Sequence, residues 1–228
     1  MNSINQIRAT LLVNIFSFVF GLVLLISKFQ YLQDENLSHV QILDMLLSDI
    51  HYFQSWNIVV YLIYGMSLLH LTITLFFATK RTMPQIATGF LVVGSVWSGY
   101  MLCSGGIAIS LINSISKIYK YNSELAVEIW ISGSLVHESI GGGNELVGAI
   151  WLGLISYIYP KGKGLSMATK RFGYVVAFLG LCTLFDPYET FSSLFGVGLI
   201  LWFLLLYTVV PTSFQTWIIR KKHARVCE

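Results

Sequence analysis

Charged residues are scarce in this chain, and their scarcity excludes most soluble proteins. Asp, Glu, Lys and Arg make up 11% of the 228 residues and hydrophobic residues 55%, whereas typical soluble domains carry about 25% charged residues. So few charges cannot cover the water-facing surface of a domain of this length. The mean hydropathy of +0.70 therefore predicts an integral membrane protein, in which lipid takes the place of a polar coat.

Cysteine and catalytic motifs are scarce as well. The three cysteines lack the spacing of a zinc site or a disulfide framework. No nucleophile elbow, Walker loop, dinucleotide fingerprint or paired CxxC is present. No basic stripe is interleaved with exposed aromatics, so we expect no nucleic-acid partner. The sequence thus contains no complete catalytic set and indicates no cofactor.

Apolar runs, by contrast, are abundant and approach the roughly 20 residues that span a bilayer. The first follows Arg8 and leads to Lys28 without a small-x-small cleavage site, so we interpret it as an uncleaved helix rather than a signal peptide. We predict a single all-α membrane domain with six transmembrane helices, at residues 9–26, 56–77, 86–111, 144–158, 172–185 and 191–210.

Residues 37–53 have a different pattern. Apolar residues recur there at near-helical spacing, while Asp44, Ser48 and Asp49 fall largely between them. Ser38 with Gln41 resembles a capping box. This pattern predicts an amphipathic helix on the external membrane surface or over the bundle.

The most distinctive stretch is residues 137–145, which combines His137, two glutamates, an asparagine and three consecutive glycines. One helix over residues 125–159 would be roughly 50 Å long, against about 30 Å of hydrocarbon. Each glycine costs a helix about 1 kcal/mol relative to alanine. We therefore predict a short surface-lying or re-entrant helix over 126–139 before the fourth membrane helix, with the helix break at Gly141, Gly142 and Gly143.

The distribution of lysine and arginine sets the orientation. With six crossings, 11 of these residues lie on the side of both termini and only Lys28, Lys117 and Lys120 on the other. The positive-inside rule then places both termini in the cytoplasm. A seventh crossing at 126–139, with the N-terminus outside, gives the same count. That segment is short and contains Glu128, His137 and Glu138, so we favour six crossings.

Acidic residues fall on the opposite side in the six-helix topology, since Glu228 alone maps to the cytoplasm. This distribution suits an external surface that attracts cations, although outer loops that simply avoid Lys and Arg are an equal explanation. The residues that we predict to bind a ligand at the external face are His137, Glu138, Asn144, Glu145 and Asp186.

Glu145 is the most informative of these residues, because a carboxylate near the membrane should face the bundle, a water-filled vestibule or a cation. The competing interpretation is a helix cap stabilised by the helix dipole. The glycines likewise either expose backbone beside a cavity, as broken helices do in transporters, or form a simple joint. A metal shared by His51, His137, Glu138 and Glu145 is a minor alternative, because HExxH is incomplete.

The later half of the chain resembles a known family. Residues 144–152 after Gly142 and Gly143, then Lys170, Arg171, Phe172, Gly173, Gly180 and Asp186, are similar to a family of bacterial six-helix membrane proteins classed as a domain of unknown function. The resemblance covers roughly residues 141–186, and the first half matches only in helix layout. It implies a bacterial inner-membrane protein and no particular activity.

These observations favour a non-enzymatic binding, sensing or accessory module with an outward-facing acidic vestibule. The alternatives are an intramembrane metal-dependent hydrolase acting on lipid and, third, a small transporter, which the lack of an evident internal repeat disfavours. The expected partners are the lipid bilayer, a cationic or small-molecule ligand outside, and anionic lipid head groups at the tail residues Arg220, Lys221, Lys222 and Arg225.

Overall fold

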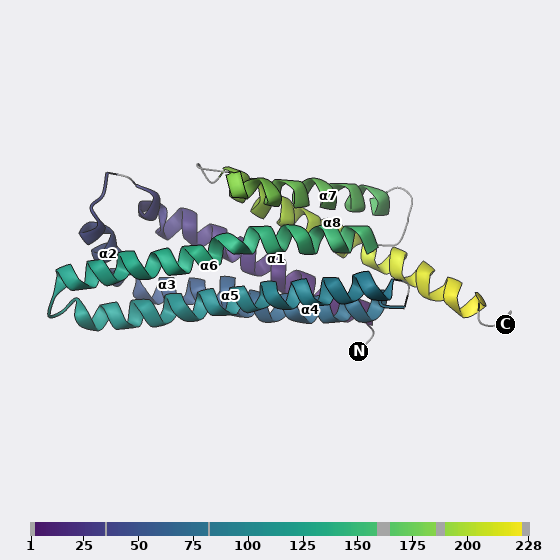
Figure 1. Ribbon diagram of the computed structural model, residues 1–228, viewed down its shortest axis with the longest axis horizontal. Helices are drawn as coiled ribbons and strands as arrows, with labels where there is room; N and C mark the ends of the chain where they lie inside the picture. The colour runs from purple at the N-terminus through teal and green to yellow at the C-terminus, as the bar shows by residue number, and fades with distance from the viewer. Residues whose placement is uncertain (1–2, 35, 82, 159–164, 186–189, 225–228) are drawn as a thin grey trace. The chain divides into compact units, whose positions relative to one another are not determined.

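The computed structural model describes residues 3–34, 36–81, 83–158, 165–185 and 190–224, and this part of the chain is all-helical, as predicted (Figure 1). The elements in chain order are α1 (Ser3–Lys28), the 3₁₀ turn η1 (Gln30–Gln33), α2 (His39–Ser48), α3 (Ile50–Asn57), the π-helix η2 (Ile58–Ile63), α4 (Tyr64–Thr79), α5 (Pro84–Ile118), α6 (Ser123–Ile158), α7 (Leu165–Cys182), the 3₁₀ turn η3 (Thr183–Phe185) and α8 (Thr190–Ala224).

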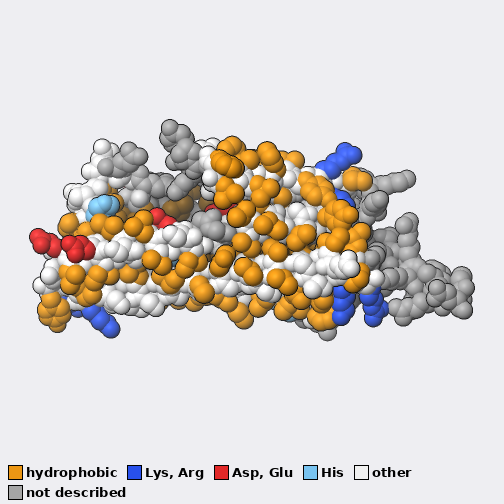
Figure 2. All heavy atoms as spheres, viewed as in Figure 1, with side chains coloured by type: hydrophobic (Ala, Val, Ile, Leu, Met, Phe, Trp, Pro, Cys, Tyr) orange, Lys and Arg blue, Asp and Glu red, His pale blue; other side chains and the backbone are white. Residues whose placement is uncertain are grey.

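Five helical segments in the described residues are long and apolar enough to cross a membrane: Ile4–Lys28, Ile50–Thr79, Pro84–Ile118, Ser166–Phe185 and Thr190–Val210. They overlap five of the six predicted spans, and the sixth, 144–158, is the C-terminal part of α6. Large hydrophobic side chains such as Phe16, Ile26 and Phe178 are about 60% exposed or more, and Figure 2 shows many hydrophobic side chains along the visible helices. Exposed apolar surface on this scale fits lipid rather than water as the surroundings.

The expected helix break before the fourth membrane helix is absent, because α6 is one helix of 36 residues that includes Gly141, Gly142 and Gly143. Residues 126–139 therefore form neither a separate nor a re-entrant helix. The prediction gave too much weight to glycine propensity, which is measured in water. Propensity is a weak guide in a folded protein, because tertiary context routinely overrides it.

The amphipathic segment is helical, as predicted, but it has a joint. The capping box forms: the Gln41 amide donates to Ser38 Oγ at 3.4 Å and the Ser38 amide to Gln41 Oε1 at 2.9 Å. The helix then ends at Ser48, and Asp49 separates α2 from α3. Because α3 continues through η2 into α4, the second membrane helix begins at Ile50 rather than at residue 56.

The described chain packs as two compact units. One consists of Met1–Ile15, Ser67–Trp97 and Glu145–Glu228, and the other of Phe16–Met66 and Ser98–Asn144. The first contains 11 of the 14 Lys and Arg residues, and the second contains seven of the 11 Asp and Glu residues. We call them the basic unit and the acidic unit.

The core of the basic unit is built on two buried tryptophans. Trp151 of α6 donates from Nε1 to Thr72 Oγ1 of α4 at 3.0 Å, and Trp202 of α8 donates from Nε1 to the Thr169 carbonyl of α7 at 3.2 Å. Both indoles are fully buried or nearly so. Gly94 leaves room for the Trp151 indole, because a Cβ added at this glycine would lie 2.7 Å from Trp151 Nε1.

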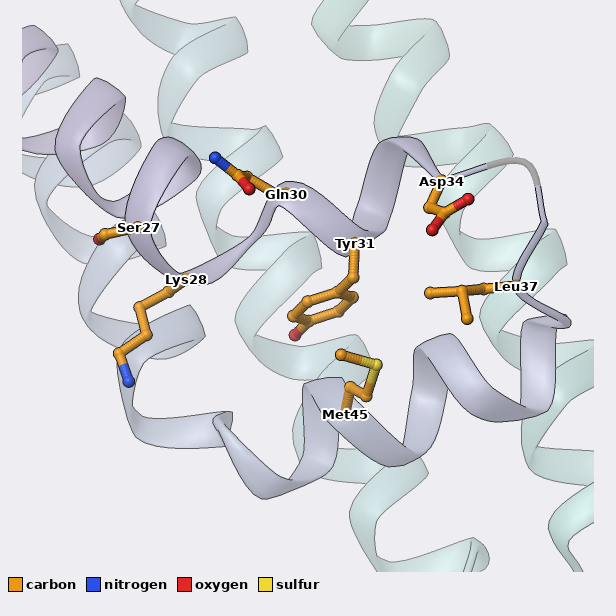
Figure 3. A pocket seen from close by; sticks show the side chains of 7 residues that line it. All are labelled: Ser27, Lys28, Gln30, Tyr31, Asp34, Leu37 and Met45. Atoms are coloured by element: carbon orange, nitrogen blue, oxygen red, sulfur yellow. The ribbon is translucent and has the colours of Figure 1, made fainter.

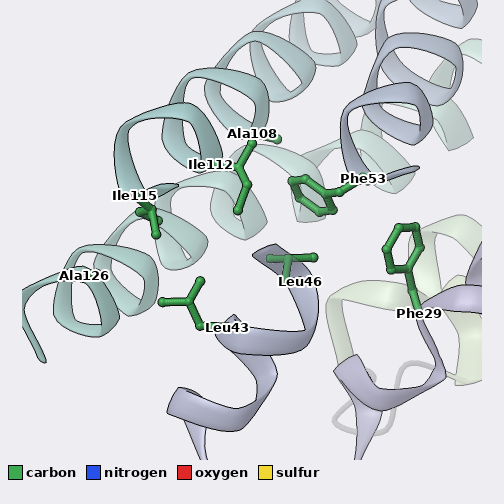
Figure 4. Close-up of a cluster of buried hydrophobic side chains, with 8 residues drawn as sticks. All are labelled: Phe29, Leu43, Leu46, Phe53, Ala108, Ile112, Ile115 and Ala126. Carbon is green, nitrogen blue, oxygen red and sulfur yellow. The ribbon is translucent and has the colours of Figure 1, made fainter. Parts of the chain in front are cut away.

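The core of the acidic unit joins α2 and α3 to the ends of α5 and α6 (Figure 4). Its fully or almost fully buried members are Phe29, Leu43, Leu46, Phe53, Ala108, Ile112, Ile115 and Ala126. Two polar contacts link the same elements: the Tyr119 hydroxyl donates to Asp44 Oδ1, and Gln54 Nε2 donates to Asn113 Oδ1 at 2.7 Å. The predicted surface helix thus covers the α5–α6 turn.

Candidate functional site

Polar residues follow one another along a partly buried face of α6 within the acidic unit. Ser134, His137 and Asn144 lie on one helix face, three and seven residues apart, and all three are partly buried. The neighbouring Leu135 and Val136 are 60% and 52% exposed on the other face. We call Ser134, His137 and Asn144 the polar stripe.

The polar stripe has hydrogen-bonding atoms without partners among the described residues. These atoms are Ser134 Oγ, His137 Nε2 and Asn144 Oδ1, and each is buried. Buried polar groups in proteins are almost always paired with protein or water, and an unpaired one in hydrocarbon costs several kcal/mol. Residues of the stripe can therefore accept hydrogen bonds from water or a polar ligand, or donate hydrogen bonds to them.

Tyr61 of the π-helix η2 lies against the stripe. Its ring meets the His137 imidazole edge to face, with the ring centroids 5.5 Å apart. Gly105 lets Tyr61 pack closely against α5, since a Cβ at Gly105 would lie 2.7 Å from Tyr61 Cβ. Asn57, at the start of η2, is fully buried; its Nδ2 donates to the Phe53 carbonyl at 2.9 Å, while its Oδ1 has no partner in the described structure.

Ser134 and His137 do not form a nucleophile–base pair in the described structure. A serine nucleophile needs a base within hydrogen-bonding distance, yet neither Ser134 Oγ nor His137 Nε2 has a hydrogen-bond partner in the described chain. No group of three or more His, Cys, Asp or Glu side chains in the described residues could hold a metal ion. His51, His137, Glu138 and Glu145 are therefore not brought together as a metal site.

The described residues among those predicted to bind a ligand do not all share one face of α6. His137 and Asn144 lie on the polar stripe, whereas Glu138 is exposed on another face of α6. Glu145 is partly buried and belongs to the basic unit. Asp186 lies outside the described residues. Sequence reasoning missed Tyr61 as a site residue, because a tyrosine in an apolar run gives no sign of a π-helix; such single π turns are frequent at functional sites.

A second polar feature of the acidic unit is a shallow, open pocket of about 720 Å³ (Figure 3). It lies where α1 ends and η1 begins, opposite α2. Its polar lining residues are Ser27, Lys28, Gln30, Tyr31 and Asp34. The Tyr31 hydroxyl is buried and has no hydrogen-bond partner in the described chain.

Electrostatics fix the ionisation of two of these groups. Burial, followed by the nearby Asp49 carboxylate, raises the pKa of Tyr31 to about 12, so this side chain is a neutral donor at physiological pH. Asp34 Oδ1 accepts from the Asn36 amide at 3.0 Å and from Asn36 Nδ2 at 2.9 Å. These hydrogen bonds lower the pKa of Asp34, which is therefore an anion.

No protein-family model, curated protein or solved structure matches the chain. The functional inference therefore depends on the geometry of these residues.

Proposed function

We propose that this is a non-enzymatic binding module of a bacterial inner membrane, in which the polar stripe of α6 lines a water-filled vestibule open to the external side. The observation that carries the proposal is the set of buried, unpartnered polar atoms on one face of α6, at Ser134, His137 and Asn144. Binding, sensing and accessory roles all require such a site. The choice of a bacterial inner membrane is part of this proposal and follows from the resemblance inferred from the sequence alone.

The length of α6 supports a topology of six crossings. At 1.5 Å per residue its 36 residues extend about 54 Å, which exceeds the hydrocarbon thickness by over 20 Å. The helix can thus cross as the fourth span and continue beyond the external boundary. A seventh crossing would need a chain reversal near residue 140, and α6 is continuous there.

The distribution of charge supports the orientation. The 11 Lys and Arg residues of the basic unit are the ones that six crossings assign to the cytoplasm, and the acidic unit contains Lys28, Lys117 and Lys120. By the positive-inside rule both termini then lie in the cytoplasm. The acidic residues of the other unit create an external field that attracts cations. We infer a small cationic or hydrogen-bonding ligand for the vestibule.

Cysteine accessibility tests this proposal. In a chain with Cys103, Cys182 and Cys227 changed to serine, a membrane-impermeant maleimide is added to right-side-out vesicles of single-cysteine variants. Ser134→Cys, which is nearly isosteric, and His137→Cys are expected to react, because a thiol in water forms the reactive thiolate. The control Ile150→Cys, at an exposed residue of the same helix within the fourth span, is expected to remain unmodified because its side chain faces lipid.

Two results would contradict the proposal. If Ser134→Cys is labelled no faster than Ile150→Cys, the stripe is dry and lines no vestibule. If it is labelled only in inverted vesicles, the vestibule opens to the cytoplasm and the orientation is wrong. A circular dichroism spectrum and a melting curve like those of the parent chain establish that each variant is folded.

A further inference from the structure

The pocket beside Tyr31 is positioned at a membrane boundary. Lys28 is the last residue of the candidate span Ile4–Lys28, and the chain turns there into η1. Basic residues at such helix ends extend toward lipid head groups. A molecule that enters this pocket can therefore arrive from the outer surface of the bilayer.

Opposite charges occupy two ends of the pocket (Figure 3). Lys28 is at one end, with its Nζ 4.7 Å from the centroid of the Tyr52 ring. Asp34 is at the other end and is fully ionised, as described above. The Tyr31 hydroxyl lies between them. A ligand that satisfies both charges needs an anionic group and a cationic group.

The rest of the lining suits a ligand with an apolar part. Leu37 and Met45 complete the pocket, and Met45 is 40% exposed. The volume of about 720 Å³ falls within the roughly 300–1,000 Å³ of small-ligand sites. It accommodates a head group together with the glycerol region that follows it.

We propose that this pocket binds a zwitterionic phospholipid that carries a primary ammonium, as phosphatidylethanolamine does. The phosphate lies beside Lys28, and the ammonium donates to Asp34. Phosphatidylglycerol has the phosphate but no cation for Asp34. Phosphatidylcholine has the cation but no N–H to donate. The pocket is separate from the polar stripe, so this inference does not depend on the vestibule.

Lipid retention measures the selectivity directly. The purified full chain in detergent is titrated with short-chain phosphatidylethanolamine, phosphatidylglycerol and phosphatidylcholine and examined by native mass spectrometry. We expect phosphatidylethanolamine to bind about tenfold more tightly than the other two, the effect of one charge-assisted hydrogen bond. Asp34→Asn is expected to abolish this preference. Tyr31→Phe, which removes only a buried hydroxyl, is expected to retain it. Tyr121→Phe, at a 90% exposed tyrosine outside the pocket, is the control.

Three results would overturn the proposal. One is equal binding of the three lipids by the folded parent chain. Another is an unchanged preference for phosphatidylethanolamine in Asp34→Asn, whose exposed side chain can change without loss of the fold. The third is competition by free phosphoethanolamine at the same concentration as the lipid, which would assign the site to a soluble ligand. Preference lost in Asp34→Asn and retained in Tyr121→Phe supports it.

Discussion

Gly94 offers a sharp test of how α4, α5 and α6 pack in the basic unit. An ideal Cβ at this position would lie 2.5 Å from Thr72 Cγ2, 2.6 Å from Thr72 Oγ1 and 2.7 Å from Trp151 Nε1. All these distances are below what a methyl group tolerates. Both partners of the Trp151–Thr72 hydrogen bond are therefore in its way, and Gly94→Ala must either displace α5 or break that bond.

The expected cost follows from these two effects. Overpacking a tight core costs about 1–3 kcal/mol, and an interhelical hydrogen bond in a membrane protein contributes roughly 0.6–1.7 kcal/mol. Since either effect relieves the clash, we expect a loss of roughly 1–3 kcal/mol, and at about 2–4 °C per kcal/mol for a chain of this size this lowers Tm by roughly 2–12 °C. Tryptophan fluorescence of the detergent-solubilised protein follows the melting.

Gly89→Ala is the matched control, since it lies on the same helix and nothing is within 4 Å of its added Cβ. Alanine favours a helix there by up to about 1 kcal/mol, so the Tm of Gly89→Ala should stay equal or rise. Thr72→Ser removes Cγ2 and keeps the hydroxyl, so Gly94→Ala should cost less in that background. Equal melting of Gly94→Ala and Gly89→Ala would refute the packing described here.

Three further predictions concern other contacts. Gly173→Ala should lower Tm by several degrees, because its Cβ would lie 2.1 Å from Ser156 Oγ and 2.7 Å from Trp202 Nε1. Gly196→Ala has open space around its Cβ and should leave Tm unchanged. Equal effects of the two variants on Tm would count against the α7–α8 packing. Leu46→Ala, fully buried, should cost about 2–5 kcal/mol in a melting experiment, whereas Val40→Ala on the exposed face of α2 should cost under about 0.5 kcal/mol. Tyr31 should titrate near its raised pKa of about 12, measured as the absorbance at 295 nm relative to Tyr31→Phe, and Asp49→Asn should lower that pKa. Because the pKa is raised in the folded state, the contribution of Tyr31 to stability is complete below a pH of about 10. It is lost as the pH rises through about 12.

The membrane class and most helices could be predicted, because they follow from composition and from run length alone. The capping box at Ser38 was predictable for a similar reason, since both its partners lie within four residues of sequence. Local patterns of this kind need no knowledge of the neighbouring helices. The extent of α5 to Ile118 and the start of the second span at Ile50 were less accessible, because polar residues at helix ends look like loop residues in a sequence.

The candidate site was only partly predictable. His137 and Asn144 were identified from residue type, and the polar stripe emerges only once α6 is known to continue through the three glycines. Intrinsic propensity is a weak guide to such continuity, because tertiary context routinely overrides it. Tyr61 joins His137 through a contact between residues 76 positions apart in the chain, and no local pattern indicates it.

Spin-label scanning of α6 tests the central claim most directly. A nitroxide is placed in turn at each position from residue 132 to residue 146, and its collision rates with a water-soluble nickel chelate and with oxygen are measured in bilayers. We predict that nickel accessibility peaks at residues 134, 137 and 144, with one helical period maintained through residues 141–143. Oxygen maxima at the polar stripe, or a loss of the period at the glycines, would contradict the account.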